Sequence, residues 1–300
     1  MAKAFKFGDD PWDPSHRFET SWLVSPYVLF AVRAIISLYA FTTIFFVLGW
    51  QCTHPGKNVA YACENSASSF SFFTHLTYWG LAFYFLVASV HTFTYARWHV
   101  ALLDKWPRPL QALHAFFYST ITCYPFLVTA VYWGLIYGAL PGWFPTAFGA
   151  WSNIAMHAMN SLFALFEIVI PRTNPSPLVH MFWLIVVLAL YLALAYVTKA
   201  TKGFYTYAFL DPSLQKNGLV AAYVFGIAVA ILIVFMLVWG LVWTRRWLTE
   251  SKMGMEGKFA KGGRPMATSH VSAWQDDRGD QHEMVSTTNF AKHRNSARFS

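Results

Sequence analysis

A hydroxyl and an imidazole occur in two strongly apolar stretches of the sequence, where polar side chains are costly and are therefore functional candidates. Thr74 lies in the run Phe72-Phe73-Thr74-His75, and His157 ends the run Asn153-Ile154-Ala155-Met156-His157. A hydroxyl beside a neutral imidazole is the minimal pair of nucleophile and general base. If the fold brings them together, the two residues predict covalent ester hydrolysis. The alternative for Thr74, and for Thr77 on the same helical face, is a bond back to a carbonyl of its own helix.

A polar stripe accompanies His157 along one predicted helix. Positions 153, 157, 160, 164 and 167 share a helical face, and four of them are polar: Asn153, His157, Asn160 and Glu167. Such a stripe must face the bundle interior or a wet cavity. Either Asn153 or Asn160 orients the imidazole or donates to an oxyanion, or the stripe forms interhelical hydrogen bonds that only fix packing.

Membrane helices are needed to position these residues. Hydrophobic residues make up 56% of the 300 residues and charged residues 12%, about half the charge usual for a soluble domain. Six apolar runs each approach the roughly 20 residues that cross a bilayer. They are Pro26–Gly49, Phe70–Thr94, Ala112–Gly138, Phe148–Ile170, Pro177–Thr198 and Leu219–Trp243. We therefore predict an all-α polytopic membrane protein with six transmembrane helices, since lipid-exposed backbone must satisfy its own hydrogen bonds.

The distribution of Lys and Arg predicts the orientation. Up to residue 264, thirteen of these residues outside the apolar runs fall on the side of both termini and four on the other side, which places both termini in the cytosol. The predicted organisation is a cytosolic N-terminal segment (1–25), a six-helix transmembrane domain (26–245) and a disordered cytosolic tail (246–300). The membrane is that of the endoplasmic reticulum, or another endomembrane, or the plasma membrane.

Two charged residues and two cysteines allow further predictions about contacts. Arg33 and Glu167 are the formal charges inside the six runs, both near the cytosolic side. We expect Glu167 to be buried and either protonated or paired, whereas Arg33 either pairs with it or snorkels to the interface. Cys52 and Cys63 share the first non-cytosolic loop, where they form a disulfide or remain two thiols.

Several other classes of protein are disfavoured. The sequence has no His-x-x-x-His, Cys-x-x-Cys or Gly-x-Ser-x-Gly pattern, so neither a metal nor a cofactor is predicted. Its histidines do not give a convincing ligand pair for haem, so a haem or redox membrane protein is the weakest alternative. The net charge of +8 is spread over tails and loops, which argues against a nucleic-acid partner.

Three segments, in this order, are similar to the androgen-induced protein family. They are Phe72-Phe73-Thr74, then Asn153–His157 leading to Phe166-Glu167, and Gly203-Phe204-Tyr205-Thr206-Tyr207-Ala208-Phe209-Leu210-Asp211. The resemblance covers about residues 26–245, and the differing ends suggest a fungal branch. It implies a six-span threonine hydrolase that cleaves fatty acid esters of hydroxy fatty acids. In that family pattern Thr74 matches the nucleophile and His157 the base.

These observations lead to two hypotheses about the function. The first is a membrane-embedded lipid ester hydrolase whose partners are the bilayer and its ester substrate. The second is a non-enzymatic membrane scaffold or fusion-related protein, because Thr77-Tyr78-Trp79-Gly80-Leu81 also resembles the related rolling stone family, which is linked to cell fusion. In the second reading the polar stripe serves packing alone.

Overall fold

The computed structural model describes residues 13–55, 61–137, 142 and 144–255. The chain separates into two units, residues 1–263 and 264–300, and the second lies outside the described residues. The described residues also leave out residues 1–12 of the predicted N-terminal segment and residues 256–300 of the predicted tail. Disorder of the tail therefore stays a prediction for residues 256–300.

The described residues form helices and connecting segments without a β-sheet. The α-helices are α1 (Pro26–Thr53), α2 (Glu64–Ser69), α3 (Phe73–Trp98), α4 (Arg108–Val131), α5 (Ala147–Ile154), α6 (Asn160–Val169), α7 (Val179–Lys202) and α8 (Asn217–Arg246). The π-helical turns are η3 (Tyr132–Ile136), η5 (Ala155–Met159) and η7 (Trp247–Lys252). The 3₁₀ turns are η2 (Leu102–Lys105) and η6 (Ala208–Leu210).

The prediction of an all-α membrane protein is confirmed, but in the part of the chain that the structure describes five helices, not six, are long and apolar enough to be candidate spans. Among the described residues, α1, α3, α4 with η3, α7, and α8 with η7 are long and apolar enough to cross a membrane. The predicted fourth span, Phe148–Ile170, is helical as far as residue 169, but η5 divides the helical stretch 147–169 into the shorter α5 and α6. Local sequence signals set several ends. Ser25 caps α1 ahead of Pro26, and Gly203, with a φ of +80°, ends α7.

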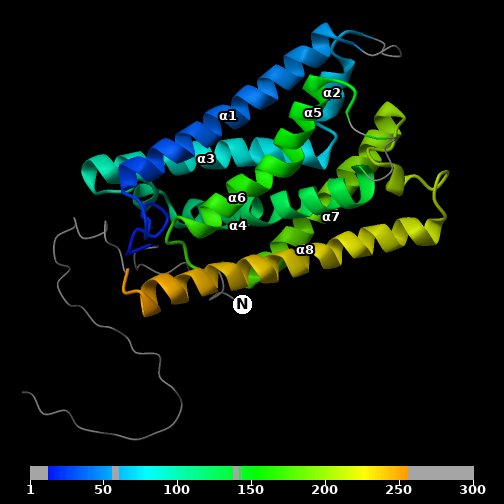
Figure 1. Ribbon diagram of the computed structural model, residues 1–300. Coiled ribbons are helices and arrows are strands. Elements are labelled where there is room, and N and C mark those ends of the chain that lie inside the picture. The colour runs from blue at the N-terminus through cyan, green and yellow to red at the C-terminus, as the bar shows by residue number, and fades with distance from the viewer. Residues whose placement is uncertain (1–12, 56–60, 138–141, 143, 256–300) are drawn as a thin grey trace, which may run out of the picture. The chain divides into compact units, whose positions relative to one another are not determined.

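Helix α4 is the centre of the packing. Figure 1 shows α1 lying along α3 and α8 running along the opposite side of the helices. One apolar cluster joins α1 and α3 to Tyr118 and Ile121 of α4. A second joins α7 and α8 to Tyr124 and Leu127 of the same helix. Because α4 contributes to both clusters, it fixes the distance between the two halves of the helical unit.

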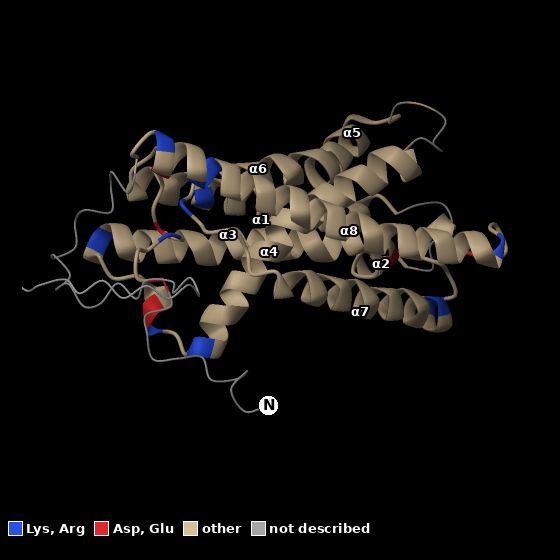
Figure 2. Cartoon of the chain, turned by 90° about the horizontal axis from the view of Figure 1, so that it is seen from below, with Lys and Arg blue, Asp and Glu red and all other residues tan. Residues whose placement is uncertain are grey.

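The charged residues lie mainly at helix ends, and Figure 2 shows uncharged residues along most of each long helix. Arg33 and Glu167 are an exception, with exposed side-chain fractions of 1% and 0%. Arg33 pairs with Glu167 through two contacts, Nε to Oε2 at 3.1 Å and Nη2 to Oε1. Its Nη1 also donates to the Phe18 carbonyl at 2.7 Å and the Thr92 hydroxyl at 2.6 Å. The expected burial of Glu167 is confirmed, and of the alternatives left open by the sequence the structure shows the pair, so Arg33 does not snorkel.

A second set of contacts ties α8 to the same end of the bundle. Arg245 donates to the carbonyls of Ile168, at 2.7 Å, and Pro171. Arg17 binds both carboxylate oxygens of Glu250 at 2.7 Å. The helical conformation therefore continues as η7 beyond residue 246, where the sequence suggested that the tail begins, and it packs on the N-terminal segment.

The cysteines lie at the opposite end of α1. Cys52 in its last turn and Cys63 before α2 form a disulfide, which decides between the two alternatives left open by the sequence. The Ser66 hydroxyl of α2 donates to the Leu48 carbonyl at 2.6 Å and holds the same junction. Cys123 is a buried free thiol of α4, in keeping with a packing role.

Glu19 in the N-terminal segment is a buried acid. Its side chain is 1% exposed, and neither carboxyl oxygen has a hydrogen-bond partner among the described residues. Burial raises the pKa of Glu19 well above its usual value, reinforced by the nearby carboxylates of Asp13 and Asp104 and opposed by Arg33. Folding therefore favours the neutral acid.

Removing one partner of the Arg33–Glu167 pair should lower the stability of the protein far more than removing both partners. Arg33→Met or Glu167→Leu leaves one charge buried and unpaired, which costs about 3–5 kcal/mol. The double variant replaces both charges with apolar groups and should recover most of that loss. Thermal unfolding in detergent measures the effect, with exposed Arg97→Ala as the control. Additive losses in the double variant would contradict the coupling.

Glu19→Gln should stabilise the protein increasingly as the pH rises. The unfolded chain releases the Glu19 proton near its ordinary pKa of about 4.3, whereas the folded chain retains it, so wild-type stability falls as pH rises between those two pKa values. The amide cannot ionise and escapes this loss of about 1.4 kcal/mol per pH unit. Melting temperatures at pH 5 and pH 8 test this, and parallel pH profiles would contradict it.

Candidate active site

Thr74 is the second residue of α3, where backbone N–H groups have no partner within the helix. The N–H of Phe73 donates to the hydroxyl of Tyr207 at 3.1 Å. Tyr207 comes from the connection between α7 and α8, and it lines the same cavity as Thr74. Tyr207 thus satisfies the start of α3 and adds a second hydroxyl-bearing side chain to the lining of the cavity.

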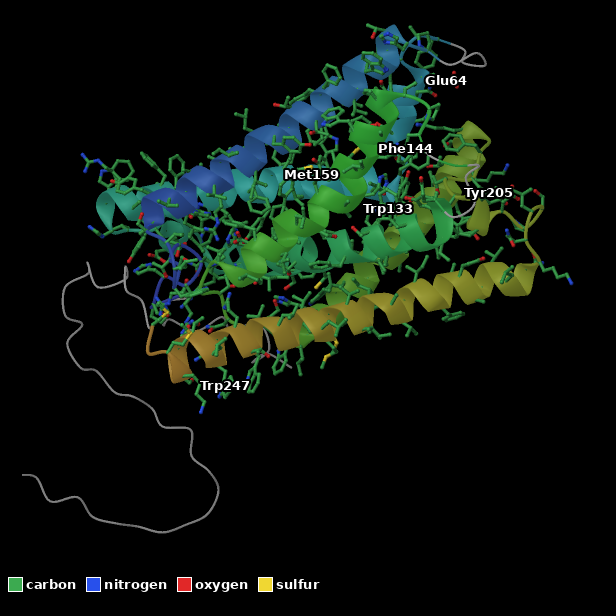
Figure 3. The ribbon with its side chains drawn as sticks, viewed as in Figure 1. Glu64, Trp133, Phe144, Met159, Tyr205 and Trp247 are labelled. Carbon is green, nitrogen blue, oxygen red and sulfur yellow. A yellow bond between two sulfur atoms is a disulfide. The ribbon has the colours of Figure 1, made fainter. Side chains whose placement is uncertain are left out.

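His157 lies in the π-turn η5, which reroutes the backbone hydrogen bonds between α5 and α6. Its carbonyl accepts from the Thr129 hydroxyl at 2.8 Å and from the indole Nε1 of Trp133 at 2.9 Å. Trp133, labelled in Figure 3, belongs to η3, the π-turn that extends α4. Single π-turns are frequent at functional sites, and here one of them bonds to the other.

The imidazole of His157 is held in one tautomer. Its Nδ1 lies 3.0 Å from the carbonyl oxygen of Asn153. A carbonyl can only accept, so Nδ1 carries the hydrogen and the neutral ring keeps the lone pair on Nε2. The ring stacks on Tyr132, with centroids 3.6 Å apart, and the Tyr132 hydroxyl donates to the Asn153 side chain at 2.7 Å. Asn153 therefore orients the histidine through both its carbonyl and Tyr132.

Thr74 and His157 line one cavity of about 580 Å³. His75, Tyr132 and Tyr207 line it as well, with side chains from α3, η3, η5 and the segment before α8. Both predicted residues are buried, at 9% and 8% exposure. The structure thus brings together the hydroxyl and the imidazole that the sequence singled out, with the nitrogen lone pair available for a proton.

The rest of the polar stripe does not line this cavity. Asn160 accepts from the Thr129 hydroxyl at 3.2 Å and from the Ser161 N–H at 2.7 Å. Glu167 is bound by Arg33 and by the Tyr84 hydroxyl at 3.0 Å. His157, Asn160 and Glu167 of the predicted stripe are buried and Asn153 is half-buried, and the stripe divides into a part that orients His157 and a part that joins helices.

Sequence reasoning missed several residues of the cavity, among them His75, Tyr132 and Tyr207. His75 lies about 100° from Thr74 around an ideal helix, yet the cavity is wide enough for both to line it. Tyr132 stands in an apolar run without a distinguishing signal. Tyr207 was present in the third segment of the family resemblance but received no role. Spacing along one helix does not predict which loop will cover its end.

Thr77 provides an internal contrast to Thr74. Its hydroxyl donates to the Phe73 carbonyl at 2.9 Å and the Thr74 carbonyl at 3.1 Å, as expected for a membrane threonine. It lines a different cavity of about 510 Å³, together with residues of α4 and α7. Among the described residues, no cluster of three or more His, Cys, Asp or Glu side chains has an arrangement suited to a metal ion.

Comparisons with family models, with curated proteins and with solved structures give no match to this chain.

Proposed function

We propose that this chain is a membrane-embedded hydrolase of lipid carboxylic esters, with Thr74 as nucleophile and His157 as general base. The observation that carries the proposal is the shared cavity, which is lined by Thr74 and by a histidine whose Nδ1 is bonded to a carbonyl, so that Nε2 keeps its lone pair. The resemblance to the androgen-induced protein family supports the same roles and adds fatty acid esters of hydroxy fatty acids as the substrate class.

In the proposed reaction, His157 Nε2 takes the proton of Thr74 as the threonine oxygen bonds to the ester carbonyl carbon. The carbon–oxygen bond to the alcohol then breaks, and the alcohol leaves with the proton from His157. Water attacks the acyl-threonine, gives a proton to His157 and releases the fatty acid, while Thr74 regains its proton. Such a base contributes about 10²–10⁴-fold. The Tyr207 hydroxyl, from a residue that lines the same cavity as Thr74, is the proposed donor for the oxyanion.

The proposed membrane arrangement has six spans. Residues 147–169 form one helical stretch long enough to cross the hydrocarbon core, with the π-turn η5 carrying His157 inside the membrane. Six spans put both termini on one side, and the excess of Lys and Arg there makes it the cytosol. The Cys52–Cys63 disulfide then lies on the opposite, oxidising side of an endoplasmic reticulum or plasma membrane.

A non-enzymatic scaffold is the second candidate. The observation in its favour is that Asn160 and Glu167 bond to neighbouring protein groups, as residues that only join helices do. The tautomer of His157 and its exposure to a cavity shared with Thr74 favour the hydrolase instead.

The proposed topology predicts opposite accessibilities for the tail and the disulfide. Protease added to sealed vesicles that expose their cytosolic face should remove the tail beyond residue 252. A membrane-impermeant maleimide should label Cys52 and Cys63 only after both reduction and permeabilisation. A protected tail, or cysteines labelled in sealed vesicles after reduction, would reverse the orientation.

Thr74 and His157 should behave as one unit, so the losses on mutation should not add. Thr74→Ala removes the attacking oxygen, and His157→Ala should lower ester hydrolysis by about 10²–10⁴-fold. The double variant should be little worse than either single variant. Hydrolysis of a fatty acid ester of a hydroxy fatty acid by purified protein is the measurement, together with labelling by a fluorophosphonate probe.

Two variants of the same residue type serve as controls. Thr74→Ser keeps the oxygen and should retain measurable turnover and labelling. Thr77→Ala removes a hydroxyl that is bonded to its own helix and should retain most of both. Normal hydrolysis by folded Thr74→Ala would exclude the threonine mechanism and leave the scaffold as the better explanation.

A further inference from the structure

A second cavity meets the candidate active site at Thr74. Its volume is about 190 Å³, and it lies among side chains of α4, α7 and α8. Thr74, Tyr132 and Tyr207 line both this cavity and the larger one that contains His157. Thr74 therefore lies where two cavities with different linings meet.

The second cavity is apolar and carries no charge. Its walls are aliphatic side chains from three helices, among them Val131, Leu188 and Ile227, and its side-chain polar atoms are the hydroxyls of one threonine and three tyrosines. Ala189 of α7 lines it and is also exposed on the outer surface of the helices. The cavity thus reaches the surface beside α7 that would face lipid, and an alkyl chain gains from burial there without leaving a polar group unpaired.

We propose that this cavity is the subsite for the acyl chain that is transferred to Thr74. The inference rests on the proposed hydrolase function and adds the orientation of the bound ester. The fatty acyl part of the ester lies among α4, α7 and α8, and the alcohol part lies in the larger cavity with His157. As the Thr74 oxygen bonds to the carbonyl carbon and the bond to the alcohol oxygen breaks, the leaving alcohol is already beside the imidazole that returns its proton.

Ala228 of α8 is the residue that sets the acyl length in this arrangement. Its side chain is a single methyl group in the cavity wall, so a larger side chain at this position fills the space that the chain requires. Thr74, His157 and the larger cavity remain unchanged. A short acyl group that does not extend to Ala228 is unaffected.

The test compares Ala228→Phe with wild type on p-nitrophenyl palmitate and p-nitrophenyl butyrate. Because each buried methylene contributes about fourfold to binding, excluding two or more should lower kcat/KM for the palmitate ester at least about tenfold. Butyrate hydrolysis should stay within about twofold. Ala222→Phe, the same change at an exposed position of α8 outside the cavity, should leave both rates near wild type.

The outcomes separate the subsite from the function. If wild type hydrolyses both esters and Ala228→Phe leaves their ratio unchanged, the subsite is wrong and the hydrolase stands. If wild type hydrolyses neither ester, the function fails and the subsite with it. If Ala228→Phe loses both activities, Ala189→Phe decides, because its exposed position tolerates the larger ring. For Ala189→Phe, selective loss of palmitate hydrolysis supports the subsite, and an unchanged ratio of the two activities, with or without loss of both, overturns it.

Discussion

The buried pair of Arg33 and Glu167 is the constraint on which the arrangement of helices depends. A charge inside an apolar bundle must be matched by an opposite charge and by further hydrogen bonds, and here the partners come from α1, α3, α6 and the N-terminal segment. These contacts fix the depth of α6 relative to α1 and α3. His157 lies ten residues before Glu167 on the same helical stretch, about 15 Å further along its axis, so an anchor at one end sets the position of the imidazole near the other.

Two π-turns, η3 and η5, orient His157 within this arrangement of helices. The turn η5 leaves the His157 carbonyl to accept from Thr129 and Trp133, and the turn η3 places Tyr132 flat against the imidazole. An uninterrupted α-helix would use that carbonyl for its own backbone bonding. The departure from regular helix is thus compensated by side chains of the neighbouring helix, and the compensation itself orients the ring. The Thr74 end is held differently, by a tyrosine hydroxyl from a loop that satisfies the first turn of α3.

The two cavities that meet at Thr74 differ in lining in the way that the proposed lipid ester substrate requires. One is apolar and reaches the surface beside α7, whereas the other is larger and carries both histidines. A lipid ester has the same division, because its acyl chain has no polar group and its ester and alcohol parts do. Thr77, one turn further along α3, has the hydrogen bonding that is usual for a threonine in a membrane helix, because its hydroxyl donates to a carbonyl of its own helix. The position at the helix start, where a loop tyrosine approaches, distinguishes Thr74 from it.

The sequence by itself determined the apolar helices and the burial of Glu167, because helical periodicity and the cost of a charge in lipid act within a segment. Arg33 and Glu167 were the two charges inside the predicted spans, but the sequence left open whether Arg33 pairs with Glu167 or snorkels, and the structure shows the pair. Only the tertiary structure decided that Cys52 and Cys63 are bonded, that the stripe divides at Asn160, and that His75, Tyr132 and Tyr207 join Thr74 and His157 around a cavity. Those outcomes depend on where π-turns form and which loop covers a helix end. Both are set by contacts between residues far apart in the chain, which no local pattern encodes.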